Sequence, residues 1–408
     1  MNLSLYKEML TLKVLTPLVL HRKRAGEQFA PTLDYIPGST VRGAFAECYL
    51  RGDQERSQDE LFKHLFLSDK VFFSDFFPAE GEGSHLTRLL PASAMACKRF
   101  DDHKKSLSDC LLWLEMLREW DAPSLEIYHR WKRCPDCMMD DLEGKRDPVD
   151  AGYYLSVERS DRLRVGKRMM ANTAIERTTR TAAHGLLFSH EAIEESGVLE
   201  GQAVFFRGLI LSAEDVGRKL KDLAPKAHKL LVGHGRSRGL GLLRVESWSN
   251  PAVEVQSLRE RWQKLNNAIH RLWEQHQREP TGQYFSLTLQ SHLALRNPAG
   301  QPVLGRISAA DLGLPSQATR CRCLLRAESV SGWNAAQGLP KADTWALSRG
   351  SVLLFRLPHG ADPAPVLDRL EALEEEGAGE RRAEGLGRMI ACDPFHYYFT
   401  DRELKGGL

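Results

Sequence analysis

Long apolar stretches are missing from the sequence: no uninterrupted run approaches the roughly 20 residues that a helix needs to cross a bilayer. Residues 1–8 also lack the apolar core of a secretory signal peptide. Cysteine is scarce, because only eight thiols are scattered through 408 residues, and a disulfide framework is therefore not expected. These absences predict a cytoplasmic protein with no membrane partner, in which clustered cysteines bind a metal.

An excess of one charge sign is missing as well. Lys and Arg total 56 against 54 Asp and Glu, which gives a formal net charge of +2. Any nucleic-acid-binding surface must therefore be local. Two stretches are locally basic: residues 229–244 contain four Lys or Arg and no acid, and residues 158–180 contain seven against three acids.

One pattern occurs twice in the chain. Residues 201–241 and residues 350–388 each predict a strand, an amphipathic helix and a glycine-rich turn that leads into another strand. Two copies predict two domains of one type. Apolar residues at three- and four-residue steps over 255–272 predict an amphipathic helix between them.

Cysteine and histidine cluster in one segment. Cys134 and Cys137 form a Cys-x-x-Cys knuckle, whose two thiolates can reach one tetrahedral ion. Cys97 is a natural third ligand, with His103 or Cys110 as the fourth. A zinc ion with four protein ligands would be structural, since no position is left open for chemistry. Reduced cysteines without a metal are the alternative, and a redox pair is disfavoured because no βαβ pattern surrounds the knuckle.

A glycine-rich stretch, residues 233–241, contains four glycines and two arginines. Glycines let backbone N–H groups approach phosphates closely, and Arg236 and Arg238 add charge and planar stacking surfaces. The stretch is not a Walker loop, because no Gly-Lys-Ser/Thr follows, and it is not a dinucleotide fingerprint, because it follows a helix. A turn of purely steric origin is the alternative.

Three further stretches have features that suit a sugar-phosphate chain. Pro37-Gly38 predicts a turn before a helix, and the N–H groups of a helix N-terminus suit a phosphate. His21–Arg24 is a compact basic cluster, and residues 168–188 mix basic, hydroxyl and small side chains in a possible β-hairpin. A helix cap, a solvated loop and a solvated hairpin are the respective alternatives.

These motifs together resemble a known family. Ile36–Ala44 is similar to the Ile-Pro-Gly-Ser-(Ser/Thr)-x-(Lys/Arg)-Gly-Ala signature of the RAMP superfamily of CRISPR-associated RNA-binding proteins. Residues 233–241 resemble its glycine-rich loop, and residues 385–387 resemble a reduced second one. Residues 173–177 and 186–189, with the cysteine knuckle, resemble the large two-domain RAMP subunit of type III-D effector complexes.

The resemblance implies an α+β fold of two ferredoxin-like (RRM-like) domains, each with a four-stranded antiparallel sheet and two helices. We therefore expect an N-terminal domain at 1–250 with a cysteine-containing insertion at about 80–150, a connecting helix at 251–280, and a C-terminal domain at 281–408. The implied function is non-catalytic. It is the binding of the repeat-derived 5′ handle of CRISPR RNA, beside the large polymerase-like subunit and backbone RAMP subunits, in antiviral defence.

The RNA contacts are expected from the glycine-rich stretches, the basic clusters and the predicted helix cap. The candidate residues are Arg22, Arg24, Gly38, Ser39, Thr40, Arg42, Arg168, Asn172, Arg177, Arg180, Gly233, His234, Gly235, Arg236, Ser237, Arg238 and Gly239. Asn172 is a departure, because relatives are expected to carry His there, so no role of that His is carried over.

Two other functions remain open at this level. An endoribonuclease that processes precursor CRISPR RNA needs a general acid and base around a 2′-hydroxyl, and His21, His184 and His234 are available. No Asp/Glu cluster suggests a two-metal nuclease. An unrelated nucleotide-binding or scaffold protein is the third possibility. We expect that the isolated protein does not cut RNA.

Overall fold

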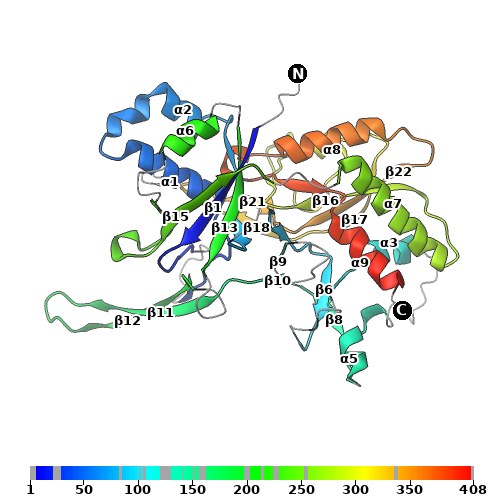
Figure 1. The fold of residues 1–408 in the computed structure, drawn as a ribbon, viewed down its shortest axis with the longest axis horizontal. Helices are drawn as coiled ribbons and strands as arrows, with labels where there is room; N and C mark the ends of the chain where they lie inside the picture. Colours follow the sequence, from blue (N-terminus) through cyan, green and yellow to red (C-terminus); the bar gives the residue numbers. More distant parts are fainter. Residues whose placement is uncertain are drawn as a thin grey trace.

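The computed structural model describes fifteen stretches of the chain: residues 6–21, 29–81, 85–100, 103, 107–119, 129, 131–140, 142–149, 152–155, 162–196, 203–212, 216–223, 229–251, 256–334 and 339–405. They form two antiparallel sheets with their helices, a smaller lobe below one of them, and a long protruding hairpin (Figure 1). This arrangement confirms the predicted α+β class. None of the described helices combines the length and apolar character that a membrane span requires.

The first sheet is built from strands that are distant in sequence. Its strands are β1 (Tyr6–Val14), β3 (Phe72–Phe73), β4 (Phe77–Ala79), β13 (Phe205–Ser212), β14 (Lys229–Leu231) and β15 (Leu242–Ser249). The order is β14-β15-β1-β13-β3, β4 also pairs with β13, and every pairing is antiparallel. Three helices accompany the sheet: α1 (Gly38–Leu50), α2 (Glu60–Phe66) and α6 (Val216–Leu223). The chain therefore runs β-α-β-β-α-β, as the ferredoxin-like unit does.

Helix α1 covers this sheet with one apolar face. Val41, Ala44 and Phe45 recur at the three- and four-residue spacing of a helical stripe and are buried. They pack in one core with Leu12 of β1 and Phe206 of β13. Full burial of Val41 or Phe45 contributes about 1.5–3 kcal/mol each, so this stripe fixes the helix on the sheet.

The second sheet repeats the strand order of the first. It contains β16 (Gly282–Leu289), β17 (Thr319–Leu324), β22 (Val352–Pro358) and β23 (Met389–Ala391), in the order β17-β22-β16-β23. Its helices are α7 (Leu258–Gln275), α8 (Ala364–Glu376) and α9 (Pro394–Lys405). Residues 290–318, all described, hold only a short 3₁₀ turn, η4 (Ala310–Leu312), where the first unit has α1. The second sheet thus departs from the expected pair of internal helices.

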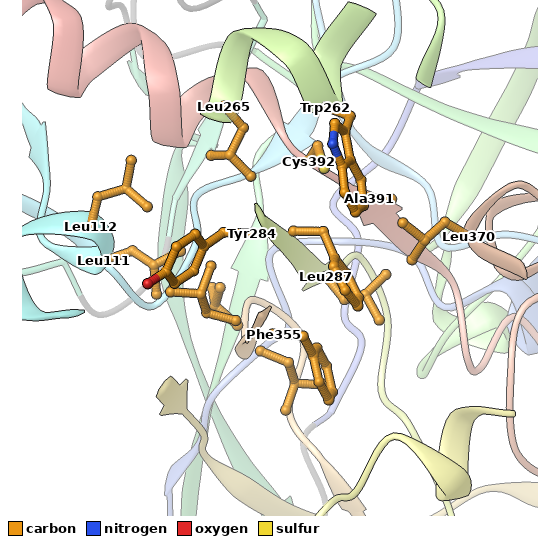
Figure 2. Packing of buried hydrophobic residues seen from close by; sticks show 14 of the residues in the cluster. Leu111, Leu112, Trp262, Leu265, Tyr284, Leu287, Phe355, Leu370, Ala391 and Cys392 are labelled. Carbon is orange, nitrogen blue, oxygen red and sulfur yellow. The ribbon is translucent and has the colours of Figure 1, made fainter. Parts of the chain in front are cut away.

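Helix α7 packs against the second sheet. The helix predicted from residues 255–272 is present, and a capping box of Ser257 and Glu260 begins it. Its buried face, which includes Trp262 and Leu265, packs against Tyr284 and Leu287 of β16 (Figure 2). The helix that connects the two halves is therefore also a core element of the second.

The smaller lobe is inserted into the sequence of the first half, between β4 and β13. It contains β5 (Arg88–Leu89), β6 (Ala94–Cys97), β7 (Ser108–Asp109), α3 (Leu111–Glu119), α5 (Pro135–Met139), β8 (Arg146–Pro148), β9 (Tyr153–Tyr154) and β10 (Arg162–Leu163). Leu111 and Leu112 of α3 lie beside Tyr284 in the core of the second sheet (Figure 2). Part of the segment expected as an N-terminal insertion thus packs on the C-terminal sheet, and the expected domain bounds stay a prediction.

Two β-hairpins are inserted at equivalent places, between the second and third strands of each sheet. The first hairpin pairs β11 (Lys167–Ile175) with β12 (Ala182–Ile193) and projects from the body as a ribbon (Figure 1). Its base is held by a parallel pairing with β2 (Phe29–Ala30). The second pairs β18 (Ala327–Val330) with β21 (Thr344–Leu347) and continues as β19 (Trp333–Asn334) with β20 (Leu339–Pro340).

A single guanidinium joins the two halves and the lobe. Arg349 donates to Asp34 Oδ1 at 2.6 Å and to the Tyr153 hydroxyl at 2.9 Å, and its guanidinium carbon lies 3.6 Å from the centroid of the Tyr35 ring. Burial raises the pKa of the Asp34 carboxyl, but the adjacent guanidinium outweighs this and holds that pKa below its ordinary value. The pair is therefore ionised throughout the neutral range.

We predict that Arg349→Ala lowers the free energy of unfolding by about 3 kcal/mol, because it leaves the Asp34 carboxylate buried without its partner. A depressed carboxyl pKa contributes stability that is present above the unfolded pKa and is lost as the pH falls through the folded one. The difference in free energy of unfolding between wild type and variant, measured with urea, should therefore become smaller at acidic pH.

The matched control is Arg296→Ala, which breaks an exposed ion pair with Glu380 at 3.0 Å. This substitution should lower the free energy of unfolding by less than about 1 kcal/mol, because exposed ion pairs are screened by water. Equal losses for the two variants would contradict a central role for Arg349.

Candidate metal cluster and RNA-binding surface

Three cysteines and one histidine converge at the end of the smaller lobe. Cys97 ends β6, Cys134 and Cys137 flank the start of α5, and the four ligand atoms, with His103, all lie within 4.8 Å of one another. The Sγ atoms of Cys97 and Cys137 are 3.6 Å apart, and Nδ1 of His103 lies 3.5 Å from Sγ of both Cys134 and Cys137. Ligands about 2.3 Å from one tetrahedral zinc would be separated by roughly 3.8 Å. The cluster can therefore hold a metal ion such as zinc.

The backbone around the cysteines favours sulfur ligands. Burial raises the pKa of Cys97, but the N–H groups of Phe100 and Arg99 hydrogen-bond its sulfur and bring that pKa below the ordinary value. Cys137 N–H lies 3.5 Å from Sγ of Cys134. Burial, followed by the neighbouring thiols of Cys97 and Cys134, raises the pKa of Cys137 to about 12. A cation between the sulfurs would reverse this last effect.

The sequence left the fourth ligand open between His103 and Cys110, and the structure brings His103 to the cluster. Cys110 instead precedes α3 and packs in the core with Leu111 and Trp113. Whether His103 or Cys110 is the fourth ligand depends on how the chain turns from β7 into α3, and the spacing of the cysteines does not encode that turn.

Gly144 is a residue of the cluster that sequence reasoning missed. A Cβ at this position would lie 2.1 Å from Sγ of Cys137. The Gly144 carbonyl also accepts from Cys134 N–H at 2.9 Å. Only a residue without a side chain fits there, and no spacing rule for metal knuckles would have identified it.

We predict one bound metal ion per chain. Cys134→Ser should lose the metal and destabilise the lobe, since a structural site couples binding to folding. Cys110→Ser should keep the metal, and Gly144→Val should lower metal occupancy by crowding Cys137. Elemental analysis with thermal unfolding would measure both effects. Well under one ion per chain in the wild type would contradict the site.

The glycine-rich loop connects β14 to β15 and contains η3 (Arg236–Arg238). Its outer glycines are explained by close backbone packing. A Cβ on Gly233 would lie 2.3 Å from the Val19 carbonyl oxygen, and one on Gly241 would lie 1.9 Å from the Val232 carbonyl oxygen. Gly239 has a left-handed φ of 83°, yet nothing lies within 4 Å of a Cβ built on it. The glycine at this position is therefore explained by its φ alone.

The middle of this loop is open. Gly233 to Ser237, with Leu231 and Glu47, line a shallow hollow of about 480 Å³. Arg236 pairs with Glu47 of α1, whereas Arg238 is exposed and makes no side-chain hydrogen bond or ion pair with the part of the chain that the structure describes. The loop thus presents one free and one paired arginine.

Three histidines from separate segments meet beside the loop. The ring of His21 lies 4.7 Å from that of His234 and 5.9 Å from that of His190, centroid to centroid. His190 belongs to β12, and its Nδ1 lies 3.3 Å from Nδ2 of Asn172 on the paired strand β11. Burial first, and then the neighbouring His234, lower the pKa of both His21 and His190. His190 was missed by sequence reasoning, because only the hairpin register brings it to the loop.

Other predicted contacts lie elsewhere on the ribbon. Arg168, near its base, pairs with Glu195 at 3.6 Å. Arg177 and Arg180 are exposed at the tip, where Arg180 adopts a left-handed φ of 58°. Arg22 and Arg24 lie outside the described residues, and so does the side chain of His184.

The predicted helix cap lies away from the first glycine loop and against the second. The N–H of Gly38 donates to Oδ1 of Asp75 at 3.0 Å, so a protein carboxylate meets the helix N-terminus. A Cβ on Gly385, which follows η5 (Arg382–Glu384), would lie 3.5 Å from Cα of Gly38. Arg42 donates to the carbonyl oxygens of Phe66 and Ser68 at 2.6 and 3.3 Å.

Ser39 and Thr40 are half-buried in the first turn of α1. The residues of this cap thus have packing roles, and their contact with RNA stays a prediction.

These features define a class of protein: an α+β fold with a glycine loop beside the base of a hairpin and a Cys₃His cluster. A family model described as "RAMP superfamily" matches residues 11–244, which is more than half of the chain. The chain is a member of the RAMP superfamily, which confirms the resemblance seen in its motifs.

Solved structures with similarity to the chain are distant. A type III-B Cmr-beta subunit, from a complex bound to cognate target RNA and AMPPnP, is 12% identical, with a TM-score of 0.41 over 85% of this chain and 86% of that one. A Cas6 product complex is 12% identical, with a TM-score of 0.36 over 95% and 99%. A Cas6 substrate mimic complex is 15% identical, with a TM-score of 0.28 over 48% and 82%. No curated protein matches the sequence significantly.

We predict that Asp75→Asn changes how stability depends on pH. Burial raises the pKa of Asp75 from 3.8 to about 6. A raised carboxyl pKa contributes stability below the unfolded value that is lost as the pH rises through the folded value. Asn keeps an acceptor for Gly38 without the charge. The free energy of unfolding of the variant, relative to that of wild type, should therefore rise by roughly 3 kcal/mol between pH 4 and pH 7.

Urea unfolding at the two pH values measures this difference, and Glu371→Gln, on the exposed side of α8, is the control. A variant that loses stability equally at both pH values would show that the Asp75 charge is not destabilising.

Proposed function

We propose that this chain is a non-catalytic RNA-binding subunit of a type III CRISPR-Cas effector complex, similar to the large two-domain subunit of type III-D systems. It would hold the repeat-derived 5′ handle of CRISPR RNA in the cytoplasm. The observation that carries the proposal is the convergence of the glycine loop, His21 and the hairpin base on one surface.

The chemistry of this surface suits a single strand. Ser237, Arg238 and Gly239 are exposed on a loop whose backbone is fixed by bonds such as His234 N–H to the Val19 carbonyl at 2.9 Å. A rigid loop with a free arginine can follow a sugar-phosphate chain, whereas reading a duplex would require an element that enters a groove. Irregular single strands are the RNA targets most often recognised in sequence-specific complexes.

Exposed apolar side chains support binding to other subunits. Met169 and Ile175 on the ribbon are 67% and 58% exposed, and Met138 and Met139 beside the metal cluster are 54% and 68% exposed. Grouped apolar side chains on a surface mark protein contacts. We propose the large polymerase-like subunit and the backbone RAMP subunits as the partners. The metal we propose for the Cys₃His cluster is a structural zinc ion.

The alternative function, processing of precursor CRISPR RNA, is favoured by one observation, the meeting of His21, His190 and His234. Cleavage would need one imidazole as a base and a second, protonated one as an acid. The pKa values of His21 and His190 are lowered, chiefly by burial, so both are neutral near pH 7 and neither is a ready acid. This supports the non-catalytic proposal, and incubation with labelled precursor RNA tests it.

We predict that Arg238→Ala weakens binding of a labelled handle RNA by roughly 1–3 kcal/mol, since it removes a charge-assisted contact. The salt slope of the affinity should also fall by about one unit, because one fewer counterion is released. Titrations of the purified chain and the assembled complex over a salt series measure both quantities.

The matched control is Arg259→Ala, which removes an exposed arginine from α7 and should change neither quantity. Arg236→Ala should have a smaller effect than Arg238→Ala, because Arg236 is already paired with Glu47. Unchanged affinity and slope for Arg238→Ala would show that the loop is only a turn. Cleavage of precursor RNA that disappears in His190→Ala would replace the proposal with the nuclease.

A further inference from the structure

The side chain of His190 has a defined tautomer. Nδ2 of Asn172 lies 3.3 Å from the Met170 carbonyl oxygen and 3.3 Å from Nδ1 of His190. A carbonyl only accepts, so the amide nitrogen, and not the amide oxygen, must face Met170. The same nitrogen then donates to Nδ1 of His190. Nδ1 is therefore the acceptor of the neutral ring, and Nε2 carries its proton.

That Nε2–H is a buried donor without an acceptor. His190 is only 7% exposed, and Nε2 has no hydrogen-bond partner within the described stretches of the chain. Nearly all buried polar groups in folded proteins are paired, so an orphan donor needs an explanation. A ligand that accepts this hydrogen bond would recover free energy that folding has lost.

The surroundings of the orphan donor favour an anion. The exposed ring of His21 packs edge-on against His190 at 71°, and His234 of the glycine loop lies beyond it. Arg238 is close enough to act electrostatically on His190. A metal ion is disfavoured, because it would need a lone pair where Nε2 holds a proton. The three imidazoles also do not form a metal-binding group in the searched part of the chain.

We propose that the Nε2–H of His190 binds a non-bridging phosphate oxygen of the RNA backbone, with Arg238 and the exposed ring of His21 beside it. The proposal rests on the proposed function and adds a binding residue that no motif of the sequence identifies. Asn172 acts as a positioning residue, because it keeps Nδ1 as an acceptor and so keeps the proton on Nε2.

The test combines one variant with single substitutions in the RNA. A series of handle RNAs, each with one phosphate replaced by a neutral methylphosphonate, is titrated against wild type and His190→Ala. Wild type should lose about tenfold in affinity at the contacted phosphate, the size expected for a hydrogen bond to a charged group. His190→Ala should bind unmodified RNA about tenfold more weakly and show no further loss at that position.

Controls separate this contact from a change in folding. His270→Ala, on an exposed part of α7, should behave as wild type throughout, and the melting temperature and metal content report whether His190→Ala is folded. Equal methylphosphonate losses in wild type and His190→Ala at every position would overturn the proposal.

Nuclear magnetic resonance of ¹⁵N-histidine-labelled wild type gives an independent readout. His190 should be the Nε2–H tautomer near neutral pH, and its signal should shift with the handle and with an oligouridylate of equal length, but not with inorganic phosphate. The Nδ1–H tautomer, no shift with either RNA, or a shift with inorganic phosphate alone would overturn the site. A shift with oligouridylate but no specific handle binding would refute the proposed function and leave the His190 site standing.

Discussion

The guanidinium of Arg349, which belongs to the second half, contacts both of the other parts of the chain, the first half and the smaller lobe. It pairs with Asp34 of the first half, lies on the ring of Tyr35, and donates to Tyr153 of the smaller lobe. A buried charge is stable only with its partners in place, so the two halves and the lobe are held at one relative position. That position also presses the second glycine turn, at Gly385, against the helix cap at Gly38. The two family motifs thus meet at the interface between the two halves.

Glycine motifs in this protein have two physical origins, which the sequence alone does not separate. Gly233 and Gly241 permit backbone contacts that a Cβ would block, whereas Gly239 supplies a left-handed φ with open space around it. Only the second kind leaves the loop surface accessible to a ligand. We therefore propose the middle of the loop, where Arg238 has no partner among the described residues, as the part that contacts RNA, and the outer glycines are explained by packing.

Local patterns were enough to predict the helix at α7, the ribbon and the cysteine cluster, because each depends on periodicity or short spacing. The α+β class was implied by the resemblance of the motifs to a family. Long-range relations were not predictable in the same way. The packing of Leu111 on Tyr284 joins residues far apart in the chain, and Cys110 lies in that same core instead of at the metal cluster. His190 becomes part of the site only through its register opposite Met170 in the hairpin and the approach of His21.

The duplicated architecture raises the question of why one copy would bind RNA and the other would not. The second hairpin is inserted where the ribbon is, yet its Lys341 pairs with Glu384 at 2.9 Å, and Arg381 pairs with the same carboxylate at 2.8 Å. These two cations beside the second glycine turn are thus neutralised within the protein. In the first copy no carboxylate of the described stretches meets Arg238, and His190 keeps an unpaired donor there. In the second copy Lys341, Arg381 and Glu384 are thus engaged in an internal ion-pair network, whereas the first copy keeps an exposed arginine beside the His190 donor, which supports placing the proposed RNA contact in the first copy.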